Sequence, residues 1–150
     1  MKNRPYATLA AALTIHFFIM WALTYSGVAA FEHIFLNANR LYMAIVMVAP
    51  MAIVMLVGMR HMFPNKRLNL GIHVAAAITF VAAFGAIQGQ WFVGDAQLSR
   101  SMIPHHSIAI KNCERANLQD PESIELCEQI IQTQHEEIAQ MRAILTRLED

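Results

Sequence analysis

Apolar residues gather in three long runs along the chain, at about residues 7–25, 41–59 and 70–88. A helix needs roughly 20 apolar residues to cross the hydrocarbon core of a bilayer. Each run is close to that length, so we predict three transmembrane helices. A cleaved secretory signal is the alternative for the first run, because Val28-Ala29-Ala30 has the small residues of a cleavage site. The run is too long for a signal core, which favours a retained helix.

The pattern changes after Phe92, where two amphipathic helices are expected at about residues 95–118 and 121–148. Asp120 can cap free N–H groups and Pro121 suits the first helical position, so the second helix is expected to begin there. Steps of four and three residues mark one packing seam on this helix, formed by Cys127, Ile131, Gln134, Ile138, Met141, Leu145 and Leu148. A matching stripe on the first helix consists of Met102, His106, Ala109, Cys113 and Ala116.

These patterns predict an all-α chain with a transmembrane domain at residues 1–92 and an antiparallel helical hairpin at residues 93–150. Folding the hairpin about Asp120 pairs positions whose numbers sum to about 240, an estimate from antiparallel geometry. The expected pairs are Cys113 with Cys127, His106 with Gln134, His105 with His135, and Met102 with Met141. Pro104 is expected to kink the first helix and leave a polar gap, or else to begin the helix after a break.

The distribution of charged residues changes at the same point of the chain as the hydrophobic pattern, near Phe92. Seven charged residues lie up to Phe92, six of them basic, whereas the last 58 residues hold fifteen, ten of them acidic. Two basic residues precede the first run and three lie between residues 60 and 67, so the positive-inside rule places the amino terminus and the second loop in the cytoplasm. After three crossings the hairpin emerges outside, which for a bacterial inner membrane is the periplasm.

The hairpin resembles the domain of unknown function 305 family. The resemblance rests on Met102-Ile103-Pro104-His105-His106-Ser107-Ile108-Ala109-Ile110, followed by Cys113, Cys127, Ile130, Gln134, Glu137, Ile138, Gln140 and Met141. It covers about residues 95–148 and implies a ferritin-like four-helix fold, with an association of several members with copper binding or tolerance.

The chain departs from the family pattern in three ways. Asn112 stands where members commonly have Met, and His135 stands where Gln is frequent. A full family domain tends to carry two hairpins, whereas this chain has one. We therefore expect two chains to pair into a four-helix bundle, since a lone hairpin cannot bury both sides of its seam.

Thioether and imidazole groups form a soft ligand set that suits copper. The expected ligands are Met102, His105, His106, His135 and Met141, with Gln134 and Glu137 as supporting residues around them. The alternative is that His106 only hydrogen-bonds Gln134 in a polar layer that sets the register of the helices.

Cys113 and Cys127 have two possible roles, and the sequence does not choose between them. In an oxidising compartment a disulfide is the simplest role, and if reduced the two thiolates become further metal ligands. A di-iron oxidase is disfavoured because Gln132 replaces the Glu of the expected Glu-x-x-His pattern before His135. No nucleophile with a base, phosphate loop or basic nucleic-acid patch is present, so we expect a non-enzyme that does not bind nucleic acid.

Methionine recurs at every fourth position of the second apolar run, at Met43, Met47, Met51, Met55 and Met59. Such a stripe could pass Cu(I) between weak sites, but flexible Met side chains are as suited to packing against neighbouring helices or lipid.

The sequence thus predicts a membrane-anchored periplasmic protein that sequesters copper, confers tolerance to it or hands it to a periplasmic partner. Two alternatives remain open: a non-catalytic interaction module or accessory subunit with a structural His/Gln layer, and a copper conduit that uses the Met stripe.

Overall fold

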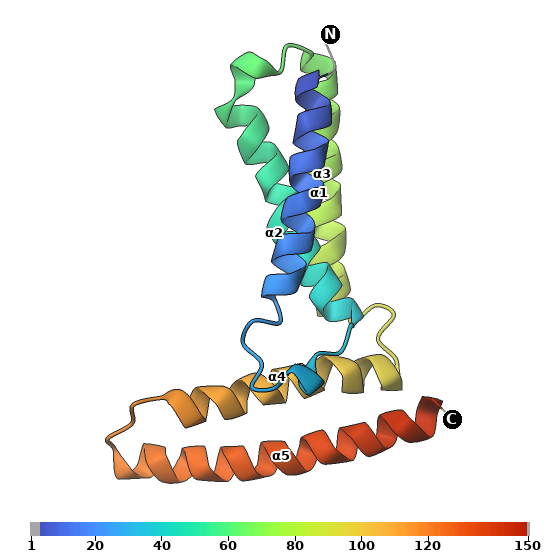
Figure 1. Ribbon diagram of the computed structural model, residues 1–150. Helices are drawn as coiled ribbons and strands as arrows, with labels where there is room; N and C mark the ends of the chain where they lie inside the picture. The colour runs from blue at the N-terminus through green and yellow to red at the C-terminus, as the bar shows by residue number, and fades with distance from the viewer. Residues whose placement is uncertain (1–3, 150) are drawn as a thin grey trace. The chain divides into compact units, whose positions relative to one another are not determined.

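The computed structural model describes residues 4–149, and these residues form α-helices, two short 3-10 helices and connections, without a strand among them. The long helices are α1 (Arg4–Leu23), α2 (Ala38–Gly58), α3 (Lys66–Gln88), α4 (Asp95–Arg115) and α5 (Pro121–Glu149), and the 3-10 helices are η1 (Phe31–His33) and η2 (Arg60–Met62). The prediction of an all-α chain is therefore confirmed (Figure 1). Helix α4 ends at Arg115, three residues earlier than expected, so residues 116–120 connect it to α5.

The chain divides into two compact units. The membrane unit consists of Met1–Thr24 and Asn39–Trp91, and the hairpin unit consists of Tyr25–Ala38 and Phe92–Asp150. One division between the two units falls between Trp91 and Phe92. The connecting segment, Tyr25–Ala38, was expected to belong to the transmembrane domain at residues 1–92. In the structure it belongs to the hairpin unit.

All three long helices of the membrane unit are long and apolar enough to cross a membrane. Six buried alanines allow α2 and α3 to approach other helices closely, as small residues do in membrane bundles: Ala44, Ala49, Ala52, Ala76, Ala83 and Ala86. Larger apolar side chains such as Val54, Ile78 and Val81 point outward. This arrangement suits lipid as the surrounding solvent, because hydrocarbon carries no penalty for exposed apolar groups.

One end of the membrane unit is closed by apolar and polar contacts. Leu9, Leu56 and Phe63 form a buried cluster. Beside it, the Tyr6 hydroxyl donates to Asn69 Oδ1 at 2.8 Å and accepts a hydrogen bond from the Asn65 backbone N–H at 3.1 Å. Asn65 also caps α3, because its side chain accepts from the Leu68 N–H at 3.1 Å.

Helices α4 and α5 run antiparallel in the hairpin unit (Figure 1). Asp120 begins α5 as expected: its carboxylate accepts from the Ser123 N–H and hydroxyl, both at 2.8 Å, and these bonds lower its pKa. Ile103 and Ile110 of α4 pack with Ile138 and Leu145 of α5 in the core.

The core position on α4 differs from the predicted stripe. The fully buried apolar residues are Ile103 and Ile110, each one position from a stripe member. Stripe members do meet α5, since His106 lies against Glu137 and Cys113 is bonded to Cys127, but α4 is covered on a second side as well. Gln97, Arg100 and Ser107 make hydrogen bonds to the connecting segment, so α4 buries a wider arc of its surface than a two-helix hairpin requires.

Pro104 lies inside α4 and is buried, so the helix does not start there. Since proline has no N–H, the Arg100 carbonyl loses its helical donor. The Asn37 side-chain amide takes that place, donating to the Arg100 carbonyl at 3.3 Å and to the Phe35 carbonyl at 2.9 Å. The expected polar gap is thus filled by a residue of the connecting segment.

Replacing Asn37 with Ala is expected to lower the free energy of unfolding by about 1–2 kcal/mol, because a buried carbonyl loses its donor. In a Pro104→Ala background residue 104 again has an N–H for the Arg100 carbonyl, so the same replacement should cost less, with a coupling of about 0.5–1 kcal/mol. Urea unfolding of the four proteins in detergent measures both values. An equal cost in the two backgrounds would contradict the assigned role of Asn37.

Candidate metal centre

His106 of α4 and Glu137 of α5 bring two ionisable groups together midway along the hairpin. His106 Nδ1 lies 2.9 Å from Glu137 Oε2, and the His106 side chain is only 11% exposed whereas that of Glu137 is 44% exposed. The two atoms are at ion-pair distance but are not aligned as a hydrogen bond. Gln134 Nε2 donates to the same carboxylate oxygen at 3.1 Å. An imidazole, a carboxylate and an amide therefore meet at one level of the hairpin.

This geometry changes the expected partner of His106, whereas the Cys113–Cys127 disulfide keeps the expected register. His106 was expected to face Gln134 directly, but its partner is Glu137, and Gln134 reaches the imidazole only through that carboxylate. The reason is that side chains on a helix point back toward its amino terminus. The carboxylate of Glu137 therefore lies over the turn that carries Gln134, which makes the supporting residues Gln134 and Glu137 neighbours.

The two candidate thioethers lie about one helical turn from this pair, both toward the same end of the hairpin. Met102 precedes His106 by four residues on α4, and Met141 follows Glu137 by four residues on α5, so each shares a helix face with one member of the pair. Because the helices are antiparallel, both one-turn steps lead in the same direction along the hairpin. Met102 is half-buried and Met141 packs against the apolar core.

His105 and His135 are exposed. The ring centroids of His105 and His106 are 5.9 Å apart with planes inclined by 62°, as expected for neighbours on a helix that point about 100° apart. Of the two adjacent histidines, His106 is thus the one that points into the hairpin. Residues 4–149 contain no group of three or more His, Cys, Asp or Glu side chains placed to bind one metal ion.

The two cysteines are joined to each other. Cys113 and Cys127 form a disulfide that closes the hairpin near residues 116–120, with their Cα atoms 5.3 Å apart. In this oxidised form neither sulfur is a thiolate ligand.

The Met stripe of α2 lies in two environments. Met43, Met47 and Met51 are exposed on the membrane unit, whereas Met55 and Met59 pack against the cluster of Leu9, Leu56 and Phe63. Packing contacts therefore account for the last two positions.

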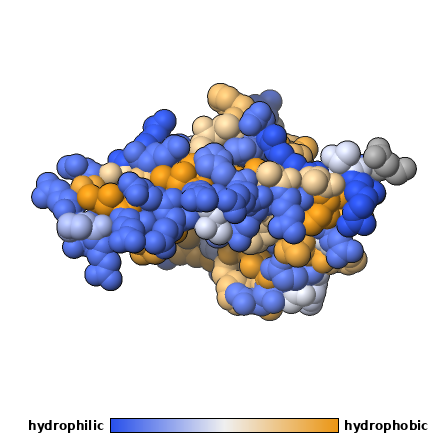
Figure 2. All heavy atoms as spheres, turned by 90° about the horizontal axis from the view of Figure 1, so that it is seen from below, coloured by the Kyte–Doolittle hydropathy of each residue, from blue (hydrophilic) through white to orange (hydrophobic). Residues whose placement is uncertain are grey.

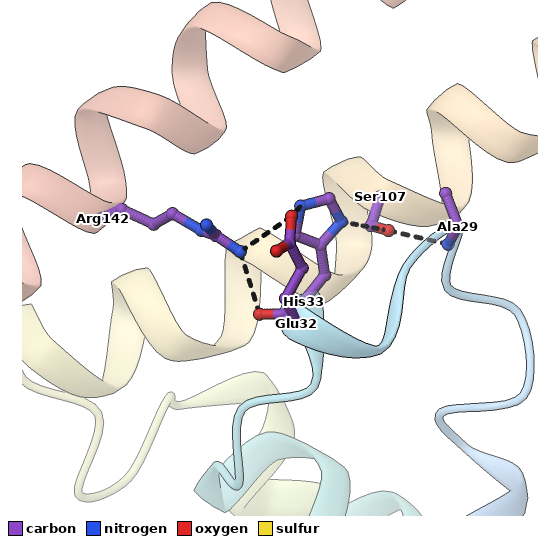
Figure 3. A network of polar contacts seen from close by, with 5 residues as sticks. All are labelled: Ala29, Glu32, His33, Ser107 and Arg142. Carbon is purple, nitrogen blue, oxygen red and sulfur yellow. Dashed lines mark hydrogen bonds and ion pairs between the residues drawn. The ribbon is translucent and has the colours of Figure 1, made fainter.

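A second polar cluster, not expected from the sequence, joins the connecting segment to α4 and α5 (Figure 3). Ser107 is completely buried, and its hydroxyl accepts from the Ala29 N–H at 2.8 Å and lies 2.8 Å from His33 Nδ1. Arg142 of α5 donates to the Glu32 carbonyl at 3.0 Å and lies 3.5 Å from the Glu32 carboxylate. The only local signal for this cluster is a serine beside the two histidines of α4, because the other residues lie in a loop without periodicity.

Burial lowers the pKa of both His33 and His106. For His33, desolvation is the main cause, and the positive charge of Arg142 adds to it. For His106, desolvation outweighs the opposing effect of the Glu137 carboxylate. Both imidazoles are therefore neutral near pH 7.

Comparison with known proteins assigns the hairpin to a protein family. Residues 80–149 match the family described as "Domain of unknown function (DUF305)". The C-terminal part of the chain, residues 80–149, therefore belongs to the DUF305 family. It is 33% identical over 112 residues to "Uncharacterized protein L153" of Acanthamoeba polyphaga mimivirus, which covers 73% of this chain and 72% of that protein. No solved structure matches the chain.

The DUF305 match begins before the hairpin. It starts at residue 80, inside α3, whereas the motif resemblance begins near residue 95. The similarity to the mimivirus protein covers 73% of the chain, more than residues 80–149 contain, so it extends further into the membrane unit. The family relationship is therefore not confined to the two helices that carry the histidines.

Acidification is expected to destabilise the DUF305 hairpin. Because His33 and His106 have a lowered pKa in the folded chain, they bind protons more readily when unfolded, and the free energy of unfolding must fall as the pH drops below their ordinary value of 6.5. Above pH 6.5 the two histidines contribute their full share to the free energy of unfolding. Unfolding measured between about pH 7.5 and about pH 5.5 should show this loss.

The double variant His33→Gln/His106→Gln should lose much of that pH dependence. His61→Gln, which alters an exposed histidine of the membrane unit, is the matched control and should keep it. An unchanged pH dependence in the double variant would show that other groups are responsible.

Proposed function

We propose that the chain is a membrane-anchored copper-binding protein whose hairpin lies outside the cytoplasm and serves in copper sequestration, tolerance or handover. The observation that carries the proposal is the His106–Glu137 pair between α4 and α5. In this proposal the copper ligands are His106, Met102 and Met141. Glu137 and Gln134 orient the imidazole.

The imidazole of His106 has the properties of a metal ligand. Metal-bound histidines usually direct their second ring nitrogen to a carboxylate or carbonyl, which fixes the ring orientation. Glu137 lies beside Nδ1, so Nε2 is the nitrogen left for a metal. The lowered pKa of His106 also helps, because only the neutral imidazole binds metal and no proton must be displaced near pH 7.

The other two ligands determine which metal fits. Thioethers are soft donors that bind Cu(I) well and bind hard cations such as Mg²⁺ poorly. Met102 and Met141 lie one turn from His106 and Glu137 respectively, on the facing sides of the two helices. One imidazole and two thioethers form a low-coordinate set suited to Cu(I), and no thiolate is needed from the Cys113–Cys127 disulfide.

The order of the helices supports a three-span membrane topology. The connecting segment follows one apolar helix and α4 follows three, so both emerge on the same side of a membrane. Hydrogen bonds from Ala29 and Asn37 to α4 are compatible with that arrangement. The basic residues of the amino terminus and the η2 loop place the opposite side in the cytoplasm, which makes the hairpin periplasmic in a bacterial inner membrane.

Pairing of two hairpins into a ferritin-like four-helix bundle is part of this proposal. The α5 side of the hairpin is mainly hydrophilic with isolated hydrophobic patches (Figure 2). Ile124 and Leu126 are among its exposed apolar residues. A second chain against these residues would bury them and bring the exposed His105 and His135 near another copy, where they could add imidazole ligands.

A non-catalytic interaction module is the second candidate function. The same His106–Glu137–Gln134 layer favours it, because a polar layer between helices can set their register without binding metal. The copper-binding function requires the His106–Glu137–Gln134 layer to take part in binding metal, whereas the interaction module does not. A metal titration distinguishes the two.

Purified chain in detergent is expected to bind one Cu(I) ion tightly in competition with a chromophoric chelator. Met102→Leu/Met141→Leu, which preserves apolar volume, should abolish this site. Glu137→Gln should weaken the affinity by about tenfold, since losing an outer carboxylate usually costs 10–100-fold.

The control is Met47→Leu/Met51→Leu, which alters the exposed part of the α2 stripe and should leave Cu(I) affinity unchanged. Loss of binding in this control instead would favour a copper conduit through the membrane unit. If the unaltered chain binds Cu(I) no more tightly than micromolar, the result would favour the non-catalytic interaction module over the copper-binding function.

The topology has its own test. Alkaline phosphatase fused after residue 150 should be active in bacterial cells, because this enzyme folds only where disulfides form, while green fluorescent protein fused at the same position should be dark. The reverse result would place the hairpin in the cytoplasm.

A further inference from the structure

The connecting segment borders a cavity that the copper proposal does not use. Its volume is about 320 Å³, and its lining includes Val28, Ala30, Phe31, Ile34 and Lys111. All of these residues belong to the hairpin unit. The cavity is at the lower end of the size range of small-molecule sites.

Lys111 provides the one charge in the lining. Its ammonium donates to the Ser26 carbonyl at 3.2 Å, and one such bond does not exhaust the three donors of a lysine. Lys111 is four residues after Ser107, so both lie on the face of α4 that the connecting segment covers. The cavity lining is therefore mainly apolar, with polar groups from Tyr25 and Ser26 and one cation, Lys111.

The position of this cavity along the chain brings it to the bilayer surface. Helix α1 ends at Leu23 and α2 begins at Ala38, so a segment between two membrane-crossing helices cannot lie far from the headgroups. Phe31 is 91% exposed at the cavity, and aromatic side chains favour the membrane interface. A ligand that is apolar at one end and anionic at the other matches this setting.

We propose that the cavity binds a phospholipid of the surrounding bilayer. The lipid phosphate accepts hydrogen bonds from Lys111, and its glycerol region packs against Val28, Ala30 and Ile34. The acyl chains stay in the bilayer because the cavity is too small for them. This inference rests on the membrane crossing in the proposed function but not on the copper site.

Native mass spectrometry of the full chain in a non-phospholipid detergent, titrated with phosphatidylglycerol, tests the inference. Lys111→Gln should weaken binding of the first lipid by about tenfold, the effect of losing one hydrogen bond between charged groups. Lys111→Arg keeps the cation and should retain binding. Ala30→Phe narrows the cavity and should weaken binding although Lys111 is unchanged.

Lys66→Gln is the matched control, because it removes a lysine at the start of α3 in the other unit. An equal loss in this variant, or no loss in Lys111→Gln, would overturn the proposed site. Glycerol 3-phosphate should fail to displace the lipid at equal concentration, and displacement would assign the cavity to small phosphates instead. If Lys111→Gln fails to fold by circular dichroism, Ala30→Phe decides, and unweakened binding there refutes the proposal.

Failure of the membrane topology gives a different result from failure of the lipid site. A chain that remains soluble and monodisperse without detergent would refute the membrane crossing. A chain that requires detergent but binds lipid independently of Lys111 and Ala30 would refute only the lipid site.

Discussion

The hydroxyl of Ser107 joins the connecting segment to the middle of α4. It is completely buried, accepts from the Ala29 N–H and lies within hydrogen-bond distance of His33 Nδ1. A buried polar group without partners would cost about 1–3 kcal/mol, and the segment that buries this hydroxyl also supplies its hydrogen-bond partners. Asn37 imposes the same requirement, since it supplies the donor that Pro104 removes from Arg100. The hairpin unit therefore consists of α4, α5 and the connecting segment, which bonds to α4 through Ser107 and Arg100 and to α5 through Arg142.

This arrangement explains why polar and apolar residues alternate around α4. Ile103 and Ile110 face α5 in the apolar core, Ser107 faces the connecting segment, and His106 meets Glu137 beside the core. Two imidazoles, His33 and His106, are thus buried in one small unit and remain neutral because of desolvation. A neutral imidazole near a carboxylate and two thioethers is the basis of the copper proposal.

Both ends of the connecting segment continue into apolar helices, which links the membrane unit to the hairpin unit by more than one covalent connection. The extent of the family similarity agrees with this organisation. The DUF305 match starts within α3, and the mimivirus protein is similar over a length that includes part of the membrane unit. The helical hairpin and the segments before it are therefore better treated as one protein than as a soluble domain with an unrelated anchor.

The sequence by itself determined the helices, because periodicity, apolar run length and caps such as Asp120 act within a few residues of each other. It also indicated which residues of the hairpin carry soft donor atoms, and it located the start of α5 at Pro121. Only the tertiary structure decided that Ile103 and Ile110 fill the core, that Glu137 rather than Gln134 meets His106, and that His33 packs on Ser107. These features depend on which surface covers each face of a helix. A loop without periodicity gives no local signal that it will provide that surface, and the direction of a long side chain shifts its contact by a turn from where its position in the sequence suggests.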